Sequence, residues 1–268
     1  MKKNTIPLIL IFCLFFLWAI SSNLLPTMIR QLMKTCELNP FEASFTESAY
    51  WLAYFICPIP IAMFMKRFSY RSGIIVGLLL AAAGGLLFFP AAMVKQYSVY
   101  LCIFFIIATG MCFLETAANP YVTALGDPEG ATRRLNLAQS FNGLGAFIAA
   151  MFLSKLVLSG QNYTRETIPA DYVGGWDAYI QAETDSMKMP YLILAVILIV
   201  VAVALLIVNL PKVEDESDEQ DNNKKLIDFS TLRLPHLRWG VIAQFFYNGG
   251  QTAINSLFLV YCCTYVGI

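Results

Sequence analysis

Seven apolar stretches, each about long enough to cross a lipid bilayer, constrain the fold of this chain more than any other feature. A helix needs about 20 apolar residues to cross the hydrocarbon core. We place the stretches at residues 6–25, 48–65, 72–93, 99–125, 135–158, 189–210 and 239–268. Barrel strands would need only about 10 residues of alternating polarity. Because backbone donors in lipid must be satisfied internally, we expect membrane-spanning helices.

Composition points the same way and excludes several classes of protein. Apolar residues make up 58% of the 268 positions and charged residues 13%, whereas soluble domains carry about 25% charged residues. The 18 Lys and Arg balance the 18 Asp and Glu, so there is no basic excess for a nucleic acid. Of the seven Cys, all but Cys36 lie in apolar stretches, and the single His, His236, lies in a polar segment. We therefore expect neither an enzyme nor a metal or other cofactor.

The distribution of Lys and Arg predicts the orientation. Most of them lie at the N-terminus or after the second, fourth and sixth stretches. By the positive-inside rule, we expect a multi-pass protein of the inner (plasma) membrane with a cytoplasmic N-terminus and the lipid bilayer as a partner. The alternative for the first stretch is a cleaved signal peptide, with Ala19-Ile20-Ser21 as the small-residue site, but its apolar run is long.

One break in composition divides the chain. Residues 214–221 are mostly acidic and are followed by Lys224-Lys225, which is typical of a solvated linker. We expect a six-helix transmembrane half at 1–210, a charged cytoplasmic linker at 211–237 and the first helix of a second half at 238–268. The segment 159–188 is predicted to be an external loop.

Glu115 is the only acidic residue that we assign to the middle of a span, because the others can be placed in loops or at span ends. Ionisable groups within a membrane are costly and therefore mark candidate functional sites. A lone carboxyl there favours its protonated form, which suits a proton carrier or a ligand for a polar substrate. The alternative is a neutral Glu that hydrogen-bonds a neighbouring helix.

Amide side chains recur at helical spacing in three of the stretches. They are Asn119 in the fourth, Asn136, Gln139 and Asn142 in the fifth, and Gln244, Asn248, Gln251 and Asn255 in the seventh. Amides both donate and accept hydrogen bonds, as the hydroxyls of a sugar require. The alternative is hydrogen bonding between helices, but three such rows favour the lining of a cavity.

The first and fourth stretches share a second feature. Ser21 precedes Pro26 by five residues, as Glu115 precedes Pro120. Interruptions at matching places in inverted repeats indicate a transport site near the membrane midplane. Trp18 and the Trp51/Tyr54 pair are candidates for packing on the apolar face of a sugar, although such residues more often pack helices together.

These segments resemble the fucose–proton symporter family, a branch of the major facilitator superfamily that includes bacterial glucose/galactose transporters. The resemblance is carried by the motifs LETAANPY (114–121), LNLAQSFN (135–142), FFLWA (15–19), AQF (243–245) and QTA (251–253). It implies an all-α membrane fold of two six-helix halves, each of 3+3 inverted repeats, with alternating access. It also implies that Glu115 matches the family's essential fourth-helix carboxylate, and that Asn23, Gln139 and Asn142 face the cavity.

The chain departs from the family pattern in three places. The family's fucose symporter has an Asp in the first helix where Pro26 stands here, which bears on proton coupling and on the identity of the sugar. The loop at 66–73 keeps the basic and glycine character of the superfamily signature but lacks its Asp. The family has twelve helices, and this sequence ends in or just after the seventh, so we expect a truncated chain.

The sequence therefore predicts a secondary active transporter that imports a monosaccharide, fucose or another hexose. The coupling cation is expected to be H+, with Na+ as the other possibility. Glu115 is assigned to substrate binding and proton coupling, and substrate binding is assigned to Asn23, Asn119, Gln139, Asn142, Gln244, Asn248 and Gln251. The alternative is a truncated, non-transporting membrane fragment or a sugar sensor; a drug exporter fits the polar walls less well.

Overall fold

The computed structural model describes residues 5–153, 163, 165–208 and 233–261, without the side chains at 5, 153, 252, 253 and 255–261. All regular elements in the described residues are helical. The chain divides into two compact units, Met1–Val213 (the bundle unit) and Glu214–Ile268 (the α9 unit). Each unit is described by itself. Most of the predicted linker, 211–237, lies outside the described residues.

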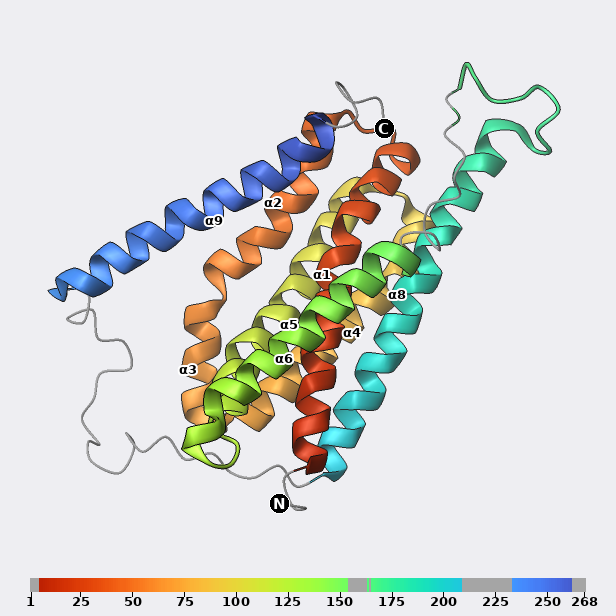
Figure 1. Cartoon of the computed structure of the whole chain (residues 1–268). Coiled ribbons are helices and arrows are strands. Elements are labelled where there is room, and N and C mark those ends of the chain that lie inside the picture. Colours follow the sequence, from red (N-terminus) through yellow and green to blue (C-terminus); the bar gives the residue numbers. More distant parts are fainter. Residues whose placement is uncertain (1–4, 154–162, 164, 209–232, 262–268) are drawn as a thin grey trace. The chain divides into compact units, whose positions relative to one another are not determined.

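The bundle unit is an array of long helices packed side by side (Figure 1). Its elements are α1 (Thr5–Thr35), α2 (Pro40–Ile56), α3 (Pro58–Phe68), α4 (Tyr70–Val94), α5 (Tyr97–Ala124), the 3₁₀-helix η2 (Pro128–Gly130), α6 (Ala131–Ile148), the π-helix η3 (Ala149–Leu153) and α8 (Gly175–Ile207). The α9 unit contains α9 (Pro235–Tyr261). All seven predicted stretches therefore coincide with helices in their described parts.

Several of the described helices are long and apolar enough to span a membrane. Among the described residues, α1, α4, α5 and α8 qualify by length and composition, and α2 with α3 makes a fifth span if the pair is counted as one. The helices α6 and α9 are not among these, and the predicted stretches that overlap them, 135–158 and 239–268, continue into residues outside the described ones.

Several helix boundaries differ from the predicted ones. α1 continues through Pro26 to Thr35, and α8 begins at Gly175, within the segment predicted to be an external loop. α2 and α3 are separate helices that meet at a 44° bend at Cys57. Pro58 and Pro60 follow this residue, and neither has a backbone N–H to continue the hydrogen-bond ladder of α2.

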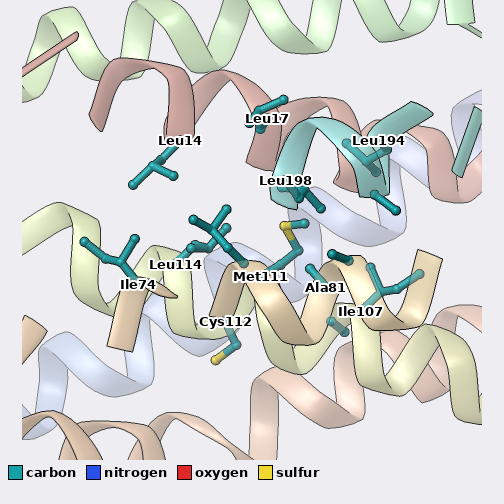
Figure 2. Packing of buried hydrophobic residues seen from close by; sticks show 14 of the residues in the cluster. Leu14, Leu17, Ile74, Ala81, Ile107, Met111, Cys112, Leu114, Leu194 and Leu198 are labelled. Carbon is teal, nitrogen blue, oxygen red and sulfur yellow. The ribbon is translucent and has the colours of Figure 1, made fainter. Parts of the chain in front are cut away.

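The core of the bundle is apolar and closely packed. Leu14 and Leu17 of α1 and Leu194 and Leu198 of α8 lie near Ile74 and Ala81 of α4 and Ile107, Met111 and Leu114 of α5 (Figure 2). Glycines allow α4 and α5 to approach within backbone contact. A Cβ added at Gly110 would lie 2.5 Å from the Ala81 nitrogen and 2.6 Å from the Gly77 carbonyl oxygen. This close approach fixes the position of α5, and with it the residues on α5, relative to α4.

Arg71, in the first turn of α4, caps the end of α8. Its Nη2 donates to the carbonyl oxygens of Leu205 (2.8 Å), Leu206 (2.9 Å) and Val208 (3.2 Å). The last carbonyls of a helix have no partner within the helix and need one elsewhere. Nη2 carries two N–H groups, which the three carbonyl oxygens share, so one side chain meets that need for α8.

Candidate functional site

Glu115 lies in α5 where this helix packs against α1, and its side chain is half-buried. Beside it is a void of about 10 Å³, lined by Leu14, Phe15 and Trp18 of α1 and by residues of α5. Such a volume holds about one water molecule. The bundle unit therefore gives the carboxyl a small cavity whose other walls are apolar. The amide-walled chamber predicted from the sequence also needs α9 of the other unit, so it stays a prediction.

The structure does bring predicted amides together next to Glu115. Asn119 donates from Nδ2 to the Glu115 carbonyl oxygen at 3.0 Å, one helical turn away. Gln139 of α6 donates from Nε2 to Asn119 Oδ1 at 3.4 Å. Asn119 is half-buried and Gln139 is exposed. This amide pair is thus shared between α5 and α6, with Gln139 still open to a ligand.

Two other predicted residues, Asn23 and Asn142, lie apart from the amide pair. Asn23 is exposed on α1 and donates from Nδ2 to the Ala19 carbonyl oxygen at 2.8 Å, within its own helix. Asn142 of α6 has a buried Nδ2 with no hydrogen-bond partner among the described residues. Buried donors without a protein partner are rare and call for a water or a ligand. Asn142 therefore stays a candidate for binding.

The aromatic residues near Glu115 connect α1 to α2. Trp18 donates from Nε1 to Tyr54 Oη at 2.9 Å, and Ser22 Oγ lies 3.1 Å from Tyr50 Oη. The Tyr50 and Tyr54 rings are stacked, with centroids 5.6 Å apart. The Trp18 N–H is therefore used in helix packing, while part of its ring borders the void beside Glu115.

The predicted residues of the seventh stretch lie on α9, in the other unit. Gln244 donates from Nε2 to Asn248 Oδ1 at 3.4 Å, which places the two amides on one face of the helix. Gln251 is exposed. The Asn255 side chain lies outside the described residues. A shared site between these amides and Glu115 stays a prediction, since the two units are described separately.

The sequence analysis missed a second buried acid, Glu183. It lies inside α8 with 1% of its surface exposed, whereas the sequence analysis placed this segment in an external loop. Gln31 of α1 donates from Nε2 to the Glu183 carbonyl oxygen at 3.0 Å and also to its carboxylate, and to Ser186 Oγ at 3.2 Å. The Lys34 ammonium lies 3.8 Å from Glu183 Oε1.

A signal for this extension of α8 was present in the sequence. Tyr179, Glu183, Met187 and Tyr191 recur at intervals of four, which is helical spacing that leads into the apolar run. All four are buried. Polar residues between them obscured the pattern and favoured the interpretation as a loop.

Comparison with known proteins supplies a family. The Major Facilitator Superfamily model matches residues 8–268. The chain is 39% identical over 263 residues to the L-fucose-proton symporter of Escherichia coli (strain K12), covering 97% of this chain and 60% of the relative. It is 36% identical over 247 residues to the glucose/galactose transporter of Brucella abortus biovar 1 (strain 9-941), covering 92% and 56% respectively.

A solved structure agrees with the sequence relatives. The crystal structure of a Major Facilitator Superfamily transporter, FucP, in the outward conformation superposes with a TM-score of 0.79 and 38% identity. The match covers 97% of this chain and 64% of that one. The chain thus spans about 60% of the length of these relatives.

Proposed function

This chain belongs to the Major Facilitator Superfamily, and on that premise we propose that it forms the N-terminal part of a secondary transporter that imports a monosaccharide. It is a multi-pass membrane protein of a transporter family and not an enzyme. The names of its relatives, an L-fucose-proton symporter and a glucose/galactose transporter, support a hexose as the substrate. The chain covers only part of each relative, so the activity belongs to the complete protein.

One observation carries the proposal. Glu115, a half-buried carboxyl within the long apolar helix α5, lies one turn from an amide pair that continues onto the exposed side chain of Gln139. A membrane-embedded acid with apolar residues around it and amides one helical turn away can bind a proton and a hydroxylated ligand in turn. The void beside Glu115 leaves room for a water to reach it.

In the proposed mechanism, Glu115 takes up a cation, H+ in preference to Na+, and bonds a sugar hydroxyl near the midplane of the bilayer. Asn23, Asn119, Gln139 and Asn142 provide further donors and acceptors from the bundle unit. From α9, Gln244, Asn248 and Gln251 complete the polar wall. Two halves then alternate access around this site, as expected for inverted repeats.

The domain division and the orientation are part of the same proposal. Residues 1–210 form the N-terminal transmembrane half, 211–237 a cytoplasmic linker, and 238–268 the first helix of the second half. The excess of Lys and Arg after the even-numbered spans supports a cytoplasmic N-terminus in the inner membrane.

The test is transport by proteoliposomes that contain the complete protein of which this chain is part. Net uptake of L-fucose, D-galactose and D-glucose is measured with pH and sodium varied independently, and compared with counterflow exchange. Glu115→Gln is expected to lose net uptake, because an amide cannot carry a proton, and to retain exchange, because it can still hydrogen-bond. Glu129→Gln makes the same chemical change at an exposed position of η2 and serves as the control.

Two results would count against the proposal. Net, gradient-driven uptake that is unchanged in Glu115→Gln removes Glu115 from the coupling role. If no monosaccharide is exchanged by the unsubstituted complete protein, a sugar sensor becomes the better interpretation.

A further inference from the structure

A second pocket lies at the end of α1, away from Glu115. Its volume is about 360 Å³, within the range of small-molecule sites, which begins at about 300 Å³. Met33 and Leu38 provide its apolar part, and Tyr163 and Trp176 add aromatic rings. Three charged side chains complete the wall: Lys34, Glu37 and Arg165. Trp18, which borders the void beside Glu115, lies about four helical turns earlier on α1.

Hydrogen bonds from two distant segments fix the polar side of this pocket. Arg165 donates to Glu37 Oε1 from Nε (3.0 Å) and Nη2 (2.8 Å). Trp176 donates from Nε1 to the same oxygen at 3.1 Å, and the Arg165 guanidinium lies 5.8 Å from the centre of the Trp176 ring. Glu37 itself has a positive φ of 52°, so its backbone turns sharply after α1. The wall is therefore preorganised, which lowers the entropic cost of binding.

Donor and acceptor capacity remains on the charged side chains. All three donors use Glu37 Oε1, and within the described residues no hydrogen bond reaches Glu37 Oε2. A guanidinium has five N–H groups, of which the contacts with Glu37 use two. The Glu37 and Arg165 side chains are 51% and 69% exposed, so a ligand can reach both.

The balance of charge indicates what kind of ligand fits. Arg165 is neutralised by Glu37, and Lys34 by the buried Glu183, whose carboxylate lies 3.8 Å from its ammonium. Counted together with Glu183, which lies behind the wall, these charges cancel, which disfavours a sugar acid or a phosphate. A neutral ring with hydroxyls on its edge and C–H groups on its face matches polar groups that lie beside aromatic and aliphatic ones.

We propose that this pocket is a second, low-affinity site for a neutral monosaccharide, which it holds at the predicted external end of α1 before the sugar reaches Glu115. The inference rests on the proposed function for the identity of the ligand, but not on Glu115 for binding. Because the Glu37 and Arg165 side chains are 51% and 69% exposed, the affinity is expected to be weak, with a Kd of about 1 mM or above.

The experiment uses the 268-residue chain in lipid nanodiscs, with Trp176 as its only tryptophan. Trp18, Trp51 and Trp239 are replaced by Phe, and the fluorescence of Trp176 is recorded as L-fucose, D-galactose or D-glucose is added to about 100 mM. Four variants are made in this background: Arg165→Ala, Glu37→Gln, Glu115→Gln and Phe41→Ala. Phe41 is an aromatic residue exposed at the start of α2 and outside the pocket, so it provides a matched control.

We expect a saturable change of Trp176 fluorescence with at least one neutral hexose. The apparent Kd should rise at least tenfold in Arg165→Ala and several-fold in Glu37→Gln, and stay within twofold in Glu115→Gln and Phe41→Ala. Circular dichroism and size-exclusion profiles establish that each variant is folded.

Four outcomes overturn the inference. The first three are no response to any neutral sugar, a response that Arg165→Ala leaves unchanged, and a stronger response to D-galacturonate than to D-galactose. The fourth is a Trp176 fluorescence that changes with the lipid composition of the nanodisc but not with added sugar. That result would indicate that Trp176 anchors the protein in the membrane. Loss of net transport in Glu115→Gln, with the Trp176 response retained, would show that the pocket at the end of α1 binds sugar independently of Glu115.

Discussion

Replacing Lys34 by methionine is expected to lower the free energy of unfolding of the bundle unit by about 3 kcal/mol. The Lys34 ammonium lies 3.8 Å from Glu183 Oε1, and the two side chains are 19% and 1% exposed. Removing one partner of a buried ion pair costs about 3–5 kcal/mol, because the remaining charge stays in the protein interior. The lower end applies because Lys34 is partly exposed and because Gln31 still donates to the carboxylate.

A double-mutant cycle tests the cause of this loss. Glu183→Leu combined with Lys34→Met removes both charges, so the double variant is expected to be more stable than Lys34→Met alone. Unfolding by SDS in mixed micelles, followed by circular dichroism, measures each free energy. Lys188→Met is the control, because its partner Asp185 is 50% exposed and such a pair contributes about 0–1 kcal/mol.

The reasoning is refuted by either of two results. One is a Lys34→Met variant that loses no more stability than Lys188→Met. The other is a double variant whose loss equals the sum of the two single losses, which would mean that Lys34 and Glu183 do not interact.

Two further predictions concern a turn and a helix contact. Hydrogen bonds from Arg165, and to a smaller extent from Trp176, hold the pKa of Glu37 below its ordinary value. The stabilisation from this contact is therefore present at a pH above the pKa of Glu37 in the unfolded chain. It is lost as the pH falls through the pKa of Glu37 in the folded protein. Arg165→Ala should raise the Glu37 pKa, and carboxyl ¹³C NMR checks it, with an unchanged pKa as the contrary result. Gly110→Ala should destabilise the bundle unit by about 1–3 kcal/mol through overpacking, because the new Cβ would lie 2.5 Å from the Ala81 nitrogen. Gly143→Ala, with no atom within 4 Å of the new Cβ, should leave the thermal unfolding temperature unchanged or slightly raised, and an equal loss in both variants contradicts the packing argument.

Much of the fold was predictable because a long run of apolar residues predicts a membrane helix. All seven predicted stretches are helical in their described parts, and the resemblance carried by the segments around Glu115 and Gln139 agrees with the family match. Apolar length, however, says little about where a helix begins when its first turns are polar. α8 therefore started earlier than predicted, and the 44° bend between α2 and α3 depended on the local effect of Pro58.

The candidate site was predictable in its residue types but not in its geometry. Spacing along one helix places Asn119 one turn from Glu115, and the structure contains that contact. The pairing of Asn119 with Gln139 depends on how α5 packs against α6, and the environment of Glu183 depends on how α1 packs against α8. Neither can be read from periodicity within one segment, because each depends on tertiary packing.

The Arg71 cap has a consequence for the order in which the bundle assembles. Its acceptor at Leu205 lies 134 positions later in the chain, so the guanidinium is synthesised long before the carbonyl that it binds. The last turn of α8 can then be completed only by docking against a helix that is already in place, since domains emerge from the ribosome N-terminus first. Arg71 therefore links completion of the last turn of α8 to docking against α4, a helix that is synthesised earlier.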